Sequence, residues 1–125
     1  MSNAKPAVGT IGWLDLTVDD APAVRGFYEK VAGWTATPIS MGDYDDWCVG
    51  PPEGDPVAGV CHRRGGNADQ PQVWLPYIVV ENLDASLAAA EKHGGAVVTP
   101  TREAGEARYA VVKDPAGAVC ALYQP

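Results

Sequence analysis

Two stretches of the chain combine the alternation of an amphipathic strand with the periodicity of a helix that follows it. Apolar and polar side chains alternate in residues 13–18, and Asp20 is suited to cap the helix that begins there. Residues 76–80 form a second predicted strand, followed by the candidate cap Asn82. Gly33 is suited to the left-handed conformation that ends a helix. The pattern therefore predicts one strand and one helix in each half of the chain.

The two halves match each other when the sequence is shifted by 62 residues, because Asp20 then meets Asn82 without a gap. The same shift produces nine identities, at Val18/Val80, Ala23/Ala85, Glu29/Glu91, Lys30/Lys92, Gly33/Gly95, Thr37/Thr99, Pro38/Pro100, Val49/Val111 and Val57/Val119. A single repeat of this length indicates a duplicated supersecondary unit and not a solenoid.

After each predicted helix, short alternating runs separated by turn residues indicate further strands, at 34–40, 44–50, 56–62, 96–102, 107–113 and 118–123. Each half therefore reads β-α-β-β-β. We expect an α+β domain in which two such modules form a curved mixed sheet with a central cleft and the helices outside. The expected boundaries are one domain at 10–125, with module 1 at about 10–62, a linker at about 63–71, module 2 at about 72–125 and an N-terminal tail at 1–9.

Composition narrows the class of protein. The 125 residues fit one domain, and the net charge of -7 disfavours binding to nucleic acid or to an anionic membrane. The three cysteines are odd in number and lack CxxC spacing, which argues against a disulfide framework and a zinc ribbon. No apolar run approaches the ~20 residues that cross a bilayer, and residues 1–9 lack the apolar core of a signal peptide. We expect a cytoplasmic protein.

Residues 13–20, 26–34, 76–84 and 108–118, taken in this order and spacing, resemble the glyoxalase/bleomycin-resistance/extradiol dioxygenase (vicinal oxygen chelate) superfamily. The similarity runs from about residue 10 to 123 and is greatest to small glyoxalase-like proteins of bacteria. The resemblance implies the two-module fold, a homodimer and a small-molecule ligand.

In metal-dependent members of that superfamily, four inward-facing residues bind one divalent metal ion, one near the start and one near the end of each module. The resemblance places these positions on Trp13, Gly59, Leu75 and Ala121, none of which can bind a metal through its side chain. We therefore expect no metal and no cofactor. An alternative ligand set on the same predicted face is Asp15, Cys61, Tyr77 and Tyr123.

The predicted wall of the cleft is mostly aromatic and apolar, and its expected ligand contacts are Trp13, Asp15, Trp47, Cys61, Leu75, Tyr77, Tyr109, Ala121 and Tyr123. The alternatives for this wall are packed core or a dimer interface. Asp15 is the candidate catalytic residue, as a general base, or a carboxylate that binds a cationic group. A hydrogen-bonded structural aspartate is the alternative for Asp15.

Three functions remain open from the sequence. The leading hypothesis is a protein that binds a small apolar or aromatic molecule without the usual metal. The second is a metal-dependent lyase or dioxygenase with an atypical ligand set, or an enzyme that uses Asp15 as its base. The third is a structural or interaction protein whose cleft is filled by its own side chains. Whether the chain is an enzyme is left open.

Overall fold

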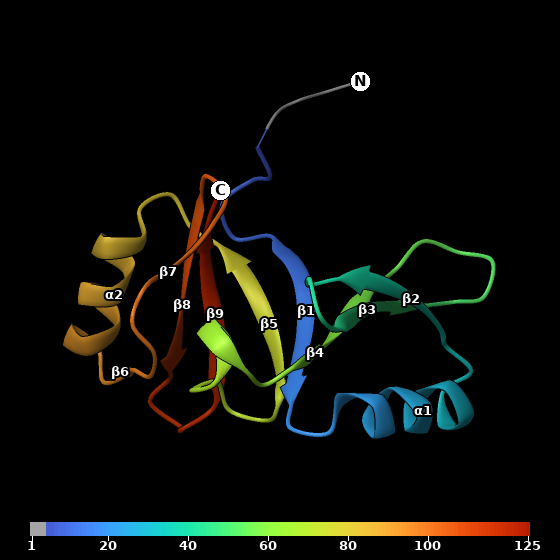
Figure 1. Ribbon diagram of the computed structural model, residues 1–125. Coiled ribbons are helices and arrows are strands. Elements are labelled where there is room, and N and C mark those ends of the chain that lie inside the picture. The colour runs from blue at the N-terminus through green and yellow to red at the C-terminus, as the bar shows by residue number, and fades with distance from the viewer. Residues whose placement is uncertain (1–4) are drawn as a thin grey trace. The chain divides into compact units, whose positions relative to one another are not determined.

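A computed structural model describes residues 5–125 and groups them into two compact units (Figure 1). The N-terminal unit is Leu14–Trp74, and the C-terminal unit combines Leu75–Pro125 with residues 5–13. Part of the expected tail, residues 1–4, lies outside the described residues. Gly9 of that tail donates its backbone N–H to the Val79 carbonyl at 2.8 Å, so this stretch pairs with the C-terminal unit.

The N-terminal unit contains the last part of β1 and one helix, followed by three strands. The bounds are β1 (Ile11–Val18), α1 (Ala21–Val31), β2 (Thr35–Ser40), β3 (Asp45–Gly50) and β4 (Ala58–His62), with a short 3₁₀ turn at Gly65–Asn67. The strand order is β2-β3-β4-β1, in which β1 and β4 are parallel and the other pairs are antiparallel.

The C-terminal unit repeats this plan. The bounds are β5 (Trp74–Val79), α2 (Leu83–Lys92), β6 (Ala96–Val97), β7 (Arg102–Ala104), β8 (Ala107–Lys113) and β9 (Val119–Gln124). The strand order is β5-β9-β8-β6, with β7 also paired to β8. The predicted α+β class and its two β-α-β-β-β modules are confirmed.

One predicted strand, 96–102, is divided into the short strands β6 and β7. The backbone N–H groups of Val98 and Thr99 both donate to the Val111 carbonyl, at 2.8 and 3.3 Å. The Thr99 hydroxyl accepts from the Val111 N–H at 3.0 Å, and Pro100 has no N–H to continue a ladder. The side chain of Thr99 therefore takes the place of backbone pairing at this point.

Both helices begin at the predicted caps. The Asp20 carboxylate accepts from the Ala23 N–H at 3.2 Å, and the Asn82 side chain accepts from the Ala85 N–H at 3.0 Å. Gly33 follows α1 with φ of 72°, the left-handed conformation that favours glycine.

The core of the N-terminal unit lies between its sheet and α1. Leu16, Val49 and Val60 are buried together with Ala21 of the helix. A cluster of aromatic rings, Tyr28, Trp34 and Trp74, packs against this core, and the Trp74 indole donates to the Tyr28 hydroxyl at 3.0 Å. Because side chains alternate along each strand, the residues between these core positions project from the opposite face of the sheet.

The residue offset that aligns the two modules changes by one at the third strand of each module. Asp15 pairs with Gly59 and Tyr77 with Ala121, which preserves the offset of 62. In the neighbouring ladders, however, Gly59 pairs with Cys48, whereas Ala121 pairs with Val111. The structural offset is therefore 63 between β3 and β8, because the connection after β3 holds one more residue. A slip of one residue turns every side chain of a strand to the other face.

Gly50 allows the loop after β3 to pack closely on the end of that strand. A Cβ atom at this position would lie 2.7 Å from the Asp55 carbonyl oxygen and 2.9 Å from the Pro56 Cα. We expect Gly50→Ala to lower the free energy of unfolding by about 1–3 kcal/mol, measured by urea denaturation. The control is Gly26→Ala in α1, where nothing lies within 4 Å of the added atom. That control should raise stability by roughly 0.5–1 kcal/mol. Equal stability of Gly50→Ala and the parent chain would contradict the expectation.

Candidate functional site

One row of residues crosses the sheet of the N-terminal unit on the face opposite α1. Strand pairing aligns Thr37 of β2 with Cys48 of β3, then with Gly59 of β4 and Asp15 of β1. Residues paired in this way project to the same side of a sheet. Cys61 lies two residues after Gly59 and shares that side. The structure thus places Asp15 and Cys61, both predicted site residues, on one face.

Asp15 and Cys61 are in direct contact. The Cys61 thiol donates to Oδ2 of Asp15 at 3.5 Å. Burial raises the pKa of the Cys61 thiol well above its ordinary value, and the negative charges of Asp15 and Asp46 raise it further. A neutral thiol is a weak hydrogen-bond donor and neither a nucleophile nor a metal ligand. Cys61 therefore holds the Asp15 carboxylate by a hydrogen bond.

A second carboxylate, that of Asp46, is buried at the end of the same face and was not among the predicted site residues. Its Oδ1 atom accepts from the backbone N–H of His62 at 2.8 Å and lies 3.1 Å from the Nδ1 atom of that side chain. Arg108, which lies 62 residues after Asp46, pairs with Asp84 at 3.0 Å. The sequence signal for Asp46 is weak, because the exposed Asp45 stands beside it at the start of β3.

Trp47 does not lie on this face. It pairs with Val60, and its ring packs against the core cluster that contains Leu16. The Arg25 guanidinium covers the ring at 4.7 Å, and the His62 ring lies 5.6 Å away. The prediction that Trp47 shares a face with Asp15 is wrong, because it relied on the offset of 62 where the strands follow 63.

The C-terminal unit brings five of the predicted residues onto one face of its sheet: Leu75, Tyr77, Tyr109, Ala121 and Tyr123. Tyr109 pairs with Tyr123, and the rings of Tyr77 and Tyr109 lie 5.8 Å apart at 52°. The three tyrosines are half-buried. We call these three residues the tyrosine face.

Two of the five residues are closed to a ligand in this structure. Leu75 and Ala121 have no exposed surface and form a buried cluster with Val111. The packed-core alternative therefore describes Leu75 and Ala121 better than the ligand-contact prediction does. Trp13, on β1, is half-buried.

The residues at the expected metal positions do not fit a divalent ion. They are an indole, a glycine and two aliphatic side chains, and two of them, Leu75 and Ala121, are fully buried among apolar neighbours. Within residues 5–125, no three His, Cys, Asp or Glu side chains gather into a group that could hold a metal ion. Metal binding needs at least three such protein donors in most sites.

Residues 10–122 match the family model of the Glyoxalase/Bleomycin resistance protein/Dioxygenase superfamily. The chain belongs to this superfamily. This chain is similar to the anthracycline biosynthesis protein DnrV of Streptomyces peucetius, which is 33% identical over 94% of this chain and 48% of its own length. A putative glyoxylase, CFP32 of Mycobacterium tuberculosis, is 31% identical over 93% of this chain and 46% of its own length. This superfamily member thus spans about half the length of these relatives.

Solved structures of other proteins share the fold. Methylmalonyl-CoA epimerase from Mycobacterium tuberculosis superimposes with a TM-score of 0.52 at 16% identity, covering 97% of this chain and 93% of the other. A hypothetical protein from Bacillus halodurans gives a TM-score of 0.56 at 9% identity, with 94% of each chain covered. At such identities the likeness shows the fold alone. Among the described residues of this superfamily member, no helix has the length and apolar character to cross a membrane.

Thiol alkylation tests the electrostatics around Cys61. We expect Asp15→Asn to increase the alkylation rates of Cys61 and Cys48 by about two- to fivefold, because each pKa is raised by burial first and by the Asp15 charge second. The matched control is Asp114→Asn, which should increase the alkylation rate of Cys120 only. Burial is the larger cause of the raised Cys120 pKa, and the Asp114 charge is the second cause. Peptide mass spectrometry after timed iodoacetamide treatment gives all three rates. An unchanged rate at Cys61 in Asp15→Asn would contradict the expectation.

Asp46 is expected to stabilise the fold through the backbone of His62. Asp46→Ala leaves the half-buried His62 N–H without its acceptor, which should lower the free energy of unfolding by about 1–3 kcal/mol. Asp46→Asn keeps a side-chain oxygen and should lose less. Urea denaturation measures both, and equal losses in the two variants would show that the acceptor oxygen is not the stabilising element.

Proposed function

We propose that this superfamily member binds a small aromatic or apolar molecule without the metal ion that metal-dependent members use. The observation that carries the proposal is the chemistry at the four expected metal positions, Trp13, Gly59, Leu75 and Ala121. With no oxygen, nitrogen or thiolate donor there, binding relies on apolar contact and hydrogen bonds.

The tyrosine face supports an aromatic ligand. Tyrosine rings provide large apolar surfaces, and each hydroxyl can donate or accept one directional hydrogen bond. The rings of Tyr77 and Tyr109 already contact each other, so little side-chain entropy is lost when a flat molecule packs on them. We propose Tyr77, Tyr109 and Tyr123 as ligand contacts of the C-terminal unit.

Asp15 is the candidate polar contact in the N-terminal unit. Its carboxylate is held by the Cys61 thiol, which fixes the direction of the acceptor oxygens. A carboxylate in this position accepts a hydrogen bond from a hydroxyl or binds an amino group of a ligand. We propose Asp15 and Cys61 as the polar contacts, with Asp15 as the base if the protein proves to be an enzyme.

The relatives support a ligand of this class. DnrV and the related DauV of Streptomyces sp. (32% identical) are named as anthracycline biosynthesis proteins, and anthracyclines are fused-ring aromatic compounds. Both names belong to chains about twice as long as the matched region. We propose an aromatic small molecule as the ligand of this chain and a homodimer as its assembly.

The two alternatives have less support. A metal-dependent lyase or dioxygenase built on Asp15, Cys61, Tyr77 and Tyr123 needs a thiolate, whereas the Cys61 thiol has a raised pKa. A purely structural or interaction role is favoured by one observation, the complete burial of Leu75 and Ala121. Absence of any ligand binding would support this second alternative.

Titration with 1,4-dihydroxyanthraquinone, a fused-ring aromatic probe, tests the proposal by fluorescence. Saturable binding should persist in excess EDTA. Tyr77→Leu should bind about three- to tenfold more weakly, because it loses an aromatic contact of roughly 0.5–1.5 kcal/mol. The matched control is Tyr44→Leu, since Tyr44 meets the His62 ring edge to face, lies under the Arg64 guanidinium and is outside the tyrosine face.

The effect of metal ions on probe binding distinguishes metal-free binding from metal-dependent binding. Binding that disappears in EDTA and returns with zinc or nickel would overturn the metal-free proposal. Elemental mass spectrometry of protein purified without chelators provides an independent measurement. A full equivalent of a divalent ion per chain would point to Asp15, Cys61, Tyr77 and Tyr123 as ligands.

A further inference from the structure

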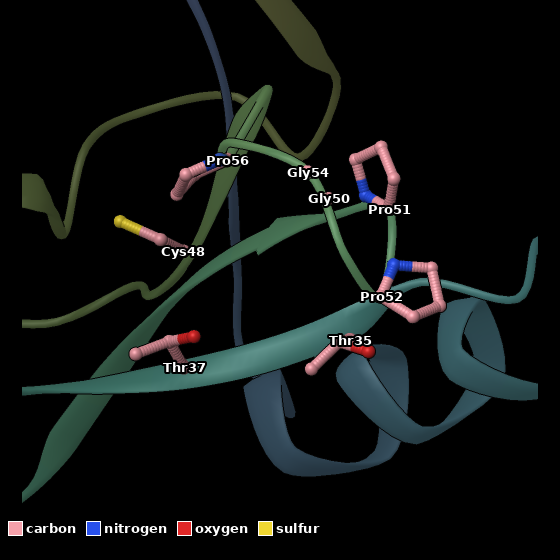
Figure 2. Close-up of a pocket in the computed structure, with 8 residues that line it drawn as sticks. All are labelled: Thr35, Thr37, Cys48, Gly50, Pro51, Pro52, Gly54 and Pro56. Carbon is pink, nitrogen blue, oxygen red and sulfur yellow. The ribbon is translucent and has the colours of Figure 1, made fainter.

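The N-terminal unit contains a pocket that sequence reasoning did not predict. It is lined by residues of β2, β3 and the following loop, Thr35, Thr37, Cys48, Gly50, Pro51, Pro52, Gly54 and Pro56 (Figure 2). Its volume is about 90 Å³, and it is partly open to solvent. Pockets that enclose a whole ligand measure roughly 300–1,000 Å³, so this one accommodates only a small group at one end of a larger molecule.

The loop over this pocket is held in one conformation by its sequence. Three prolines, at positions 51, 52 and 56, each fix a backbone φ angle. The Gly54 N–H donates to the Pro51 carbonyl at 3.2 Å, and the Val57 N–H donates to the Val49 carbonyl at 2.8 Å. The absence of a side chain at Gly50 lets the loop approach the end of β3. A pocket preformed in this way loses little entropy when a ligand enters.

The lining is uncharged. None of its eight residues carries a carboxylate, an amine or a guanidinium. Burial and the Asp15 charge raise the pKa of the Cys48 thiol, which keeps it in its neutral form. An ion would therefore find no counter-charge here, and the lining is suited to a neutral group.

Two hydroxyl groups provide the directional contacts. Thr35 and Thr37 pair with Gly50 and Cys48, so both side chains lie on the pocket side of β2. Their Cα atoms are about 7 Å apart, the spacing of alternate residues on a strand. No hydrogen bond joins either hydroxyl to another residue within 5–125. Proline rings of the loop supply the apolar surface beside them.

The pocket is continuous with the row that contains Asp15. Thr37 and Cys48, which line the pocket, are the first two members of that row, and Gly59 follows them without a side chain. A ligand that lies along this face with one end at Asp15 therefore has its other end at the pocket.

We propose that this pocket holds a small neutral group that carries a phenol or carbonyl oxygen, as one end of the ligand, with Thr35 and Thr37 as its hydrogen-bond partners. This inference rests on the proposed function. The group packs against proline carbons, and the hydroxyls of the two threonines select a phenol or carbonyl oxygen.

The test compares threonine variants in titrations with 1,4-dihydroxyanthraquinone. The double variant Thr35→Val with Thr37→Val keeps the β-branched shape that suits a strand but lacks both hydroxyls. It should bind about tenfold more weakly, the combined effect of two neutral hydrogen bonds. The double variant Thr35→Ser with Thr37→Ser retains the hydroxyls and should bind within about twofold of the parent chain. Thr101→Val, outside the pocket, is the control and should bind normally.

The outcomes distinguish this inference from the proposed function. Normal affinity in the double valine variant, together with weak binding in Tyr77→Leu, would overturn the pocket assignment and leave the proposed function intact. Absence of binding to the parent chain would overturn both. Backbone NMR supplies a second measurement, since the probe should shift the amide signals of Thr37, Cys48 and Gly54. Unchanged signals at these amides in the presence of saturating probe would also overturn the inference.

Discussion

Parallel pairing between the first and last strands of each module determines which side chains can form a site. It aligns Asp15 with Gly59 and Tyr77 with Ala121, and the antiparallel neighbours extend each row to Cys48 and to Val111. Because side chains alternate, each row lies on the face that the helix does not cover. The Asp15–Cys61 contact, the tyrosine face and the pocket beside β2 all follow from this register.

Electrostatics and packing give the two faces different characters. In the N-terminal unit, the buried carboxylate of Asp46 is satisfied by His62, and the Asp15 carboxylate accepts from a neutral thiol. In the C-terminal unit, the matching positions are aliphatic or aromatic and the interior of the row is fully buried. The two modules of this duplicated fold thus differ in the chemistry of their faces.

Superfamily membership fixes the fold but not the chemistry, which depends on the residues that the register places in each row. Methylmalonyl-CoA epimerase shares the fold at 16% identity, a level at which site residues do not transfer. At the four positions expected to hold the superfamily metal, this chain has an indole, a glycine and two aliphatic side chains. Small-molecule binding through rings, hydroxyls and one oriented carboxylate is the chemistry that these residues can support.

Much of the fold was predictable because it depends on local signals. Alternation located the strands, Asp20 and Asn82 located the helix starts, and the repeat identified two modules. Periodicity also placed Asp15 and Cys61 on one face.

What the sequence could not determine was the register after a loop of variable length. One additional residue between β3 and β4 moved Trp47 to the helix side and placed Cys48 in the row instead. Tertiary structure likewise decided three other features, because each depends on segments distant in the chain that meet in one register. They are the burial of Leu75 and Ala121, the Asp46–His62 contact and the pocket beneath the proline loop. Local propensity is encoded residue by residue, whereas register is set by long-range packing.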